Sequence, residues 1–592
     1  MKLLYSEMAD IYDKIESTTK RLEMTDLLVG FLSRTPKNLV GRVSYLAQGK
    51  LYPDFSGLKL GVAEKNIINS IAQASYLSKV EVNNLWKKIG DLGLASEEAF
   101  GKSKIQKGRL LPFEPLTVEE VYSTLSKISK TGGKGSVQNR VNALSSLLGK
   151  ATPREAKYIV RTATGRLRLG IGDMTLLDAL AIAYGKGKSS RAAVERAYNV
   201  SSDLGLVAET IAEKGMGGIA EFGIIVGKPV RPMLCERLSS AKEILEKMGG
   251  RAAAEYKYDG LRIQAHISSR NIELFSRRLE KLTDQFPDVV EGLKESLKTT
   301  DAVVEGECVA VNSSTGEFQP FQVITHRRGR KYEIEATAEE IPVTLFLFDI
   351  LYLNGETLLD TPYQKRREAL KKVLDETEHV KITHPTIVKD PESLDEFMEE
   401  AVEAGCEGTV VKSIEDNSIY QAGARGFLWI KYKREYRSEM ADTVDLAVVG
   451  AFAGRGRRAG IYGALLMAAY DAKTDMFKTV CKLGTGFSDR DLAGIPKILD
   501  ESKLTHAHAR VDSRIAADFW FVPTRIMEVR GAELTLSPSH TCGWGIVRKD
   551  SGLAIRFPRF TGRWRDDKTP EDATTVEELV KMYKSQLKKI MD

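Results

Sequence analysis

The spacing of apolar residues changes twice along this chain, and that change most constrains its fold. Residues 1–228 carry the helical period throughout. Residues 229–436 mix strand-like alternation with amphipathic helices, and residues 437–592 hold many short strands separated by glycine turns. A chain of 592 residues is too long for one domain. We therefore predict three domains with these boundaries: an all-α domain, an α+β domain of antiparallel sheets, and a β-barrel such as the OB-fold with a C-terminal helix.

Local signals support this division. Thr117 and Thr152 each stand three residues before a glutamate, which is the capping-box pattern at a helix start. Thr574 precedes Glu577 in the same way, before a predicted last helix from Val576 to Ile590. Alternation predicts strands at Ile263–Ile267, Ile272–Phe275, Ala302–Val311, Val343–Leu353 and Thr409–Lys412. Helices are predicted at Pro287–Leu297, Tyr363–Leu374 and Pro391–Ala404, and a hairpin turn at Asn354-Gly355.

Composition excludes several classes of protein. The net charge of +6 is mildly basic and permits binding to nucleic acid. The five cysteines are scattered without a C-x-x-C pair, so we expect no structural zinc and a reducing cytoplasm. The N-terminus lacks the apolar core of a signal peptide, and no apolar run reaches membrane-spanning length. We therefore expect a cytoplasmic protein.

The segment from Glu255 to Arg262, Glu-Tyr-Lys-Tyr-Asp-Gly-Leu-Arg, carries the chemistry. A lysine amine is unreactive while protonated, and burial beside cations would free its lone pair. Lys257 could then attack an electrophilic phosphorus and form a covalent phosphoramidate. Taken alone, the pattern is more often a solvated lysine beside an Asp-Gly turn.

Five further segments follow in a fixed order along the same part of the chain. They are Phe275-Ser-Arg277, Val304–Ala310 with Glu307, Leu347–Gly355 with Phe348, Glu407–Lys412, and Trp429–Lys433 with Arg425 upstream. Together with the Lys257 segment, they resemble the signature of covalent nucleotidyltransferases: ATP-dependent DNA ligases, RNA ligases and mRNA-capping enzymes. The resemblance implies that the antiparallel sheets of residues 229–436 are ATP-grasp-like.

The flanking parts narrow this resemblance. Arg565-Asp-Asp567-Lys568 is similar to the closing element of the archaeal and eukaryotic type of cellular DNA ligase. Arg231–Leu234 resembles the entry into their catalytic domain, and Leu167–Gly172 resembles part of their DNA-binding domain. The likeness is strongest to archaeal ligases, because no long N-terminal extension or C-terminal repeat domain is present.

The resemblance implies a role for each motif residue. Lys257 would attack the α-phosphorus of ATP, Phe348 would stack on adenine, and Glu255 would lie near the base. Ribose or phosphates would be held by Arg262, Arg277 and Arg425, and the α-phosphate by Lys431 and Lys433. Glu307 and Glu407 would bind Mg²⁺, for which Mn²⁺ is a possible substitute. Arg565, Asp567 and Lys568 would orient pyrophosphate.

The expected activity is ATP-dependent sealing of nicked double-stranded DNA through lysyl-AMP and AMP-DNA, in replication, repair and recombination. The alternatives are an RNA ligase, a GTP-dependent capping enzyme, or a non-catalytic DNA-binding scaffold. An NAD-dependent ligase is disfavoured because such enzymes usually carry a four-cysteine zinc module. We expect a monomer without membrane contact. A sliding clamp is a further candidate partner, through Gln106–Phe113, although Arg109 stands where an apolar residue would be expected.

Several basic segments could contact DNA or be ordinary solvated surface. The loops are Lys130–Ser136, Gly165–Gly170, His326–Lys331 and Gly454–Arg458. The C-terminal lysines Lys581, Lys584, Lys588 and Lys589 fit an amphipathic helix first and a DNA contact second.

Overall fold

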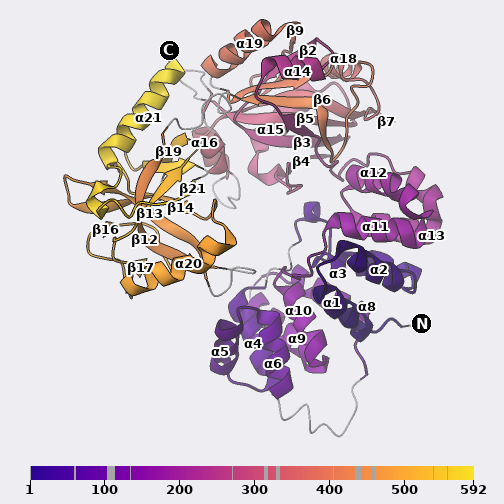
Figure 1. The fold of residues 1–592 in the computed structure, drawn as a ribbon. Coiled ribbons are helices and arrows are strands. Elements are labelled where there is room, and N and C mark those ends of the chain that lie inside the picture. The colour runs from indigo at the N-terminus through magenta and orange to yellow at the C-terminus, as the bar shows by residue number, and fades with distance from the viewer. Residues whose placement is uncertain are drawn as a thin grey trace. The chain divides into compact units, whose positions relative to one another are not determined.

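The computed structural model describes residues 2–58, 60, 62–102, 114–133, 135–269, 271–311, 318–319, 321–327, 334–404, 406–433, 442–454, 461–531, 533–537, 539–556 and 558–591 (Figure 1). The chain forms two compact units. The first comprises Met1–Phe397 and Ala404–Lys431, and the second comprises Met398–Glu403 and Tyr432–Asp592. The proposed clamp segment and the loop of Arg455–Arg458 lie outside the described residues.

The first part of the chain is helical, as predicted. Its α-helices are α1 (Tyr5–Glu16), α2 (Arg21–Leu32), α3 (Val40–Ala47), α4 (Glu64–Ser75), α5 (Lys79–Ile89), α6 (Leu92–Lys102), α8 (Val118–Lys130), α9 (Ser136–Lys150), α10 (Pro153–Ala163), α11 (Asp173–Tyr184), α12 (Arg191–Ser201) and α13 (Leu204–Ala220). The predicted caps form: Thr117 and Thr152 accept hydrogen bonds from the backbone N–H groups of Glu120 and Glu155. None of the helices in the described ranges is both long enough and apolar enough to cross a membrane.

Two sheets follow in the same unit. The first has the order β1 (Leu234–Arg237), β11 (Arg425–Lys433), β10 (Gly408–Lys412), β2 (Ala252–Tyr256) and β9 (Thr386–Val388). The second has the order β4 (Asn271–Ser276), β3 (Leu261–Ser268), β5 (Ala302–Ala310), β6 (Val343–Leu353) and β7 (Glu356–Thr357), with β8 (Val380–Ile382) beside β6. Most pairs are antiparallel, as predicted, but β1 pairs with β11 and β6 with β8 in parallel. Helices α14 (Ala241–Lys247), α15 (Pro287–Ser296), α18 (Tyr363–Val373) and α19 (Pro391–Glu403) complete this part.

The Asn-Gly turn between β6 and β7 forms as the sequence predicts. Leu353 pairs with Glu356 across it, and Asn354 and Gly355 have φ of 47° and 97°. Asparagine and glycine tolerate this left-handed backbone better than other residues do.

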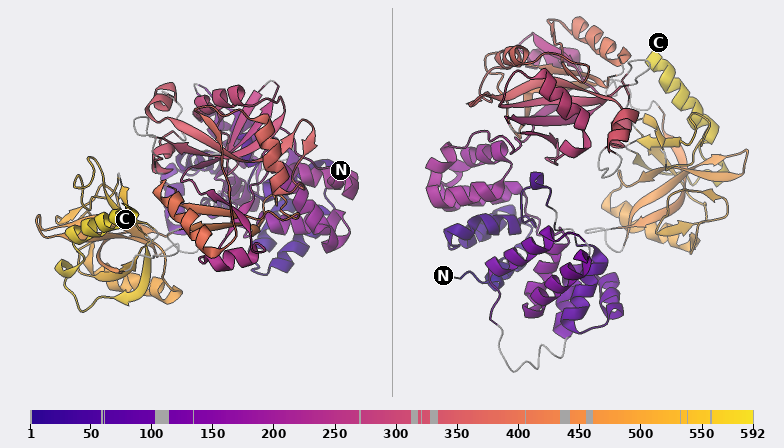
Figure 2. Two further views of the ribbon diagram at one scale, coloured as in Figure 1. Left: turned by 90° about the horizontal axis from the view of Figure 1, so that it is seen from above. Right: turned by 180° about the vertical axis from the view of Figure 1, so that it is seen from behind.

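The second unit is an OB-like β-structure with curled sheets. Its main strands are β12 (Val444–Ala453), β13 (Tyr462–Asp471), β14 (Met476–Leu483), β17 (Phe519–Phe521), β18 (Ile526–Arg530) and β21 (Arg559–Trp564); β15 (Lys503–Leu504) and β16 (Val511–Asp512) extend this sheet. A separate hairpin pairs β19 (Glu533–Ser537) with β20 (Gly552–Arg556). Helix α20 (Asp489–Leu499) and the yellow C-terminal helix α21 (Val576–Met591) pack on these strands (Figure 2).

The predicted cap of the last helix is wrong by one residue. Thr575, not Thr574, accepts the hydrogen bond from the backbone of Glu578, whose carboxylate binds the Thr575 backbone N–H at 2.7 Å. Thr574 cannot serve because its hydroxyl and its backbone N–H both bind the backbone of Asp445, at 2.9 and 2.8 Å. Thr575-x-x-Glu578 fits the capping-box pattern equally well, and the contact of Thr574 with Asp445 decides between the two threonines.

Candidate active site

Lys257 lies where the chain passes from one sheet to the other. It follows β2 directly, and β3 begins four residues later. Its backbone N–H donates to the carbonyl of Gly408 at 2.8 Å, and the N–H of Glu407 donates to the carbonyl of Lys257 at 2.9 Å. This reciprocal pairing brings together two residues 150 positions apart, and the Lys257 ammonium contacts the Glu407 carboxylate.

Gly260 allows this turn to close. A Cβ atom at this position would lie 2.5 Å from the carbonyl oxygen of Cys308 and 3.0 Å from Cγ of Glu307. Any side chain would push the turn away from β5. The Asp-Gly pair after Lys257 is therefore required by the close approach of a second strand, which the sequence alone does not reveal.

Two further carboxylates lie near Lys257. Burial raises the pKa of Glu307 to about 7; Glu407 and Asp259 act in the same direction, against Lys257 and Arg262. Burial also raises the pKa of Asp259, which accepts a hydrogen bond from the backbone of Phe321 at 3.1 Å. The sequence reasoning expected cations beside Lys257, and it did not foresee that the carboxylates of Glu407, Asp259 and Glu307 gather there.

Glu255 is buried and fully engaged. Its carboxylate accepts hydrogen bonds from the hydroxyls of Tyr363 and Thr383, and Lys412 Nζ lies 3.1 Å from both of its oxygens. Burial lowers the pKa of Lys412, against the pull of Glu255. Both oxygens of the Glu255 carboxylate thus bind protein groups, and its predicted place near adenine stays a prediction.

Phe348 lies beside this pair, on the strand β6. The Lys412 ammonium is 4.7 Å from the centre of its ring and the Arg262 guanidinium 5.3 Å. Arg262 in turn binds Glu305 at 2.7 Å, and this carboxylate raises its pKa although burial opposes the charge. The geometry joins Phe348 to two cations, each of which is held by its own carboxylate.

The other predicted phosphate ligands have more open positions. Arg277 and Arg425 are exposed at the end of β4 and the start of β11. Lys431 and Lys433 are half-buried on β11, two residues apart and therefore on one face of that strand.

The predicted C-terminal cations lie in the second unit. Arg565 binds Asp567 through Nε and Nη2, at 2.9 and 2.8 Å. Arg565 and Lys568 also both bind the carboxylate of Asp445. Asp445 was not predicted, and an acid at the start of a strand gives little signal of such a role.

Three family models match the chain. They are described as "DNA ligase N terminus", residues 4–181, "ATP dependent DNA ligase domain", residues 232–433, and "ATP dependent DNA ligase C terminal region", residues 458–568. The chain belongs to the ATP-dependent DNA ligases. DNA ligase 2 of Thermofilum pendens is 53% identical, covering 99% of this chain and 98% of that protein. The DNA ligase of Hyperthermus butylicus is 49% identical, covering 100% and 99%.

Similarity to solved structures concerns the fold alone. The structure named Pmar-Lig_PreS3 covers 94% of this ligase and 99% of its own chain, with a TM-score of 0.55 and 19% identity. The predicted fold class is confirmed by the family models and by this likeness.

The carboxylates around Lys257 fit a divalent cation. Glu307, Glu407 and Asp259 raise one another's cost of ionisation, which a bound cation would relieve. Among the residues described, no group of three or more His, Cys, Asp or Glu side chains is arranged to hold a metal ion. A Mg²⁺ site at Glu307 and Glu407 stays a prediction.

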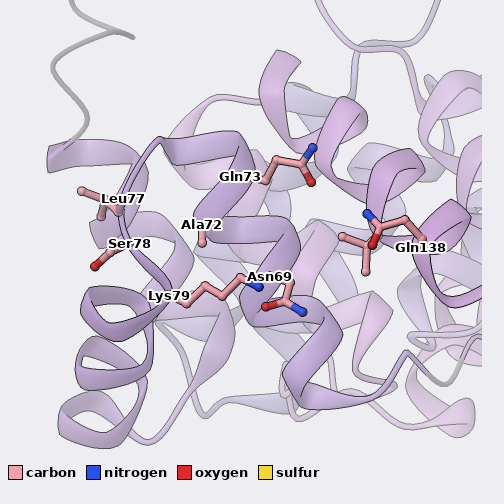
Figure 3. A pocket seen from close by; sticks show the side chains of 8 residues that line it. Asn69, Ala72, Gln73, Leu77, Ser78, Lys79 and Gln138 are labelled. Atoms are coloured by element: carbon pink, nitrogen blue, oxygen red, sulfur yellow. The ribbon is translucent and has the colours of Figure 1, made fainter.

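Two observations limit other predicted sites. Arg327 is buried and binds both carboxylate oxygens of Asp288, so this residue is neither solvated surface nor open to DNA in the structure. The rest of that loop, from Arg328, lies outside the described residues, and its two interpretations stay open. A pocket of about 470 Å³ lies among α4, α5 and α9, where Asn69, Gln73, Lys79 and Gln138 line it (Figure 3). None of its lining residues is a predicted site residue.

Proposed function

We propose that this ATP-dependent DNA ligase seals nicks between a 5′-phosphate and a 3′-hydroxyl in duplex DNA through an AMP adduct on Lys257. The observation that carries the proposal is the reciprocal backbone pairing of Lys257 with Glu407 and Gly408. It fixes a half-buried amine at a strand end beside three carboxylates, with the base-binding candidate Phe348 on the adjoining sheet.

The first step is an exchange of bonds at phosphorus. The deprotonated Nζ of Lys257 forms a bond to the α-phosphorus of ATP, and the bond from that phosphorus to the bridging oxygen breaks. Pyrophosphate leaves with the electron pair. Glu407, which contacts Nζ, is placed to accept the proton that the ammonium must lose.

Other residues would bind and orient the nucleotide. Phe348 would offer its ring to adenine, while Lys431 and Lys433 would neutralise the α-phosphate. Arg262, Arg277 and Arg425 would hold ribose or phosphates, and Arg565 and Lys568 of the second unit the pyrophosphate. Glu307 and Glu407 would hold Mg²⁺ or Mn²⁺, which would supply positive charge to the phosphate oxygens.

The remaining steps act on DNA. The 5′-phosphate displaces Lys257 and takes AMP, and the 3′-hydroxyl then displaces AMP and seals the strand. We propose that residues 1–228, 229–436 and 437–592 work as three domains that close around nicked duplex. Monomeric action in the cytoplasm, during replication, repair and recombination, belongs to the same proposal. Clamp binding through Gln106–Phe113 stays a prediction.

The test is the intact mass of the protein after incubation with ATP and Mg²⁺, then after a chase with nicked duplex. We expect an AMP adduct on Lys257 that disappears as sealed DNA forms. An adduct that forms only with GTP, or that discharges only onto RNA, would favour a capping or RNA-ligase activity instead. Absence of any adduct would leave a DNA-binding scaffold.

A further inference from the structure

Two cationic side chains of the second unit meet on one carboxylate. Oδ2 of Asp445, at the start of β12, accepts hydrogen bonds from Arg565 Nη1 at 2.6 Å and from Lys568 Nζ at 2.7 Å. Arg565 follows β21 directly and is 120 residues away in sequence. Because Arg565 Nη1 and Lys568 Nζ bind the same oxygen atom, these two nitrogen atoms lie close to each other.

The carboxylate itself is fixed by the backbone. The N–H of Asp445 donates to the hydroxyl of Thr574 at 2.9 Å, and the N–H of Thr574 donates to the Asp445 carbonyl at 2.8 Å. The turn after β21 is held as well, because the Arg565 N–H donates to the Ile526 carbonyl at 2.9 Å. Backbone hydrogen bonds thus fix Asp445 on one side of the contact and the turn that carries Arg565 on the other.

The arrangement leaves donors available to a ligand. Lys568 Nζ carries two further N–H groups beside the one that binds Asp445, and Arg565 Nη1 carries one more. The Lys568 side chain is 31% exposed. A guanidinium and an ammonium that converge on one oxygen have the spacing at which cations grip a phosphate oxygen.

The other oxygen of Asp445 argues against a purely structural pair. Oδ1 is buried, and it has no hydrogen-bond partner among the residues that the structure describes. A buried acceptor without a donor is unfavourable, so such an oxygen calls for an explanation.

We propose that Asp445 is a positioning residue of the ligase. It sets the spacing of Arg565 and Lys568, so that both cations reach one pyrophosphate oxygen during adenylation of Lys257. This inference rests on the proposed role of these two cations. It adds a residue that neither the sequence motifs nor the family comparison assigns.

The test measures adenylation of the protein and sealing of a pre-adenylated nick separately, in the whole 592-residue chain. Asp445→Asn keeps the shape of the side chain but removes its charge. We expect kcat/KM for adenylation by ATP to fall about 10- to 100-fold, because small misplacements of orienting groups have effects of this size. Sealing of a nick that already carries AMP should stay within about twofold of wild type, since that step involves no pyrophosphate. Asp445→Glu should restore part of the adenylation rate.

A matched control lies in the same unit. Asp471 of β13 is similarly buried and pairs with Lys478 at 2.9 Å. Asp471→Asn should leave adenylation at the wild-type rate. In the double variant Arg565→Ala/Lys568→Ala, adding Asp445→Asn should cause no further loss, because Asp445 acts through these two residues.

Three outcomes would overturn the inference. Normal adenylation by Asp445→Asn, when Arg565→Ala is impaired, would remove its positioning role. Equal loss in adenylation and in sealing of the pre-adenylated nick would make Asp445 merely structural. Normal adenylation by both Arg565→Ala and Lys568→Ala would refute the role of the cations and the inference together. Failure of the wild-type protein to form an adduct is the separate result that refutes the proposed function.

Discussion

Strands β2 and β10 carry two lysine–glutamate pairs that differ in their exposure to solvent and in the groups around them. β2 and its end contribute Glu255 and Lys257, while β10 and the residue before it contribute Lys412 and Glu407. In the inner pair, the Glu255 and Lys412 side chains are 3% and 2% exposed. In the outer pair, Lys257 and Glu407 are 22% and 28% exposed.

The surroundings of the two pairs explain their different uses. The inner carboxylate receives hydroxyl donors on both oxygens in addition to its lysine, so little is left for a ligand. The outer pair has Asp259 and Glu307 beside it, and these acids oppose further negative charge. A buried and satisfied ion pair therefore supports the sheet, whereas a half-open pair with excess carboxylates can exchange its partner for a substrate or a cation.

Changing the outer lysine should give the largest effect on activity. Lys257→Arg keeps the charge but provides no amine that can be freed near neutral pH. We expect adduct formation to fall by at least about 10⁴-fold, as for loss of a nucleophile. Intact mass spectrometry measures this, with retained binding to nicked DNA as the control for folding. An adduct on Lys257→Arg would place the nucleophile elsewhere.

Replacing Lys412, the lysine of the inner pair, should instead have its largest effect on the free energy of unfolding. Lys412→Met leaves Glu255 buried without its counter-ion, and losses of this kind cost about 3–5 kcal/mol. Urea unfolding, in the absence of ATP, measures the change. Lys257→Met is the matched control, because a half-open pair contributes at most about 1 kcal/mol. Equal destabilisation by the two variants would show that the inner and outer pairs contribute equally to stability.

The turn that presents the outer lysine can be tested without touching a charge. Gly260→Ala forces a Cβ atom against the Cys308 carbonyl, so Lys257 must shift. We expect adenylation to slow about 100-fold, since displacements near 1 Å have that effect. A Cβ at Gly494 in α20 would meet no atom within 4 Å, so Gly494→Ala serves as the control. Similar rates for both variants would show that the turn tolerates movement.

Glu307, one of the carboxylates beside the outer pair, can be made neutral by substitution. Glu307→Gln removes a group whose pKa burial raises to about 7. We expect the Mg²⁺ concentration for half-maximal adenylation to rise about 10-fold, in the range seen when groups around a metal site are altered. Glu273→Gln, which breaks only the partly exposed pair with Lys281, is the control. An unchanged Mg²⁺ requirement would remove Glu307 from the metal site.

Much of this ligase follows from its sequence alone. The helical, mixed and strand-rich parts, the positions of β3, β4, β5, β6 and β10, and the hairpin at Asn354-Gly355 depend on periodicity and turn chemistry over a few residues. The order of the motifs around Lys257 also identified the family. These features are local, or are linear along the chain, and need no knowledge of what packs against them.

Only the tertiary structure decided which side chains meet. It joins Lys257 to Glu407, surrounds Glu255 with donors, and buries Arg327 against Asp288. It also brings Asp445 to Arg565. Such contacts depend on strand order and on the close approach of distant backbones. No short-range pattern of residue types encodes them.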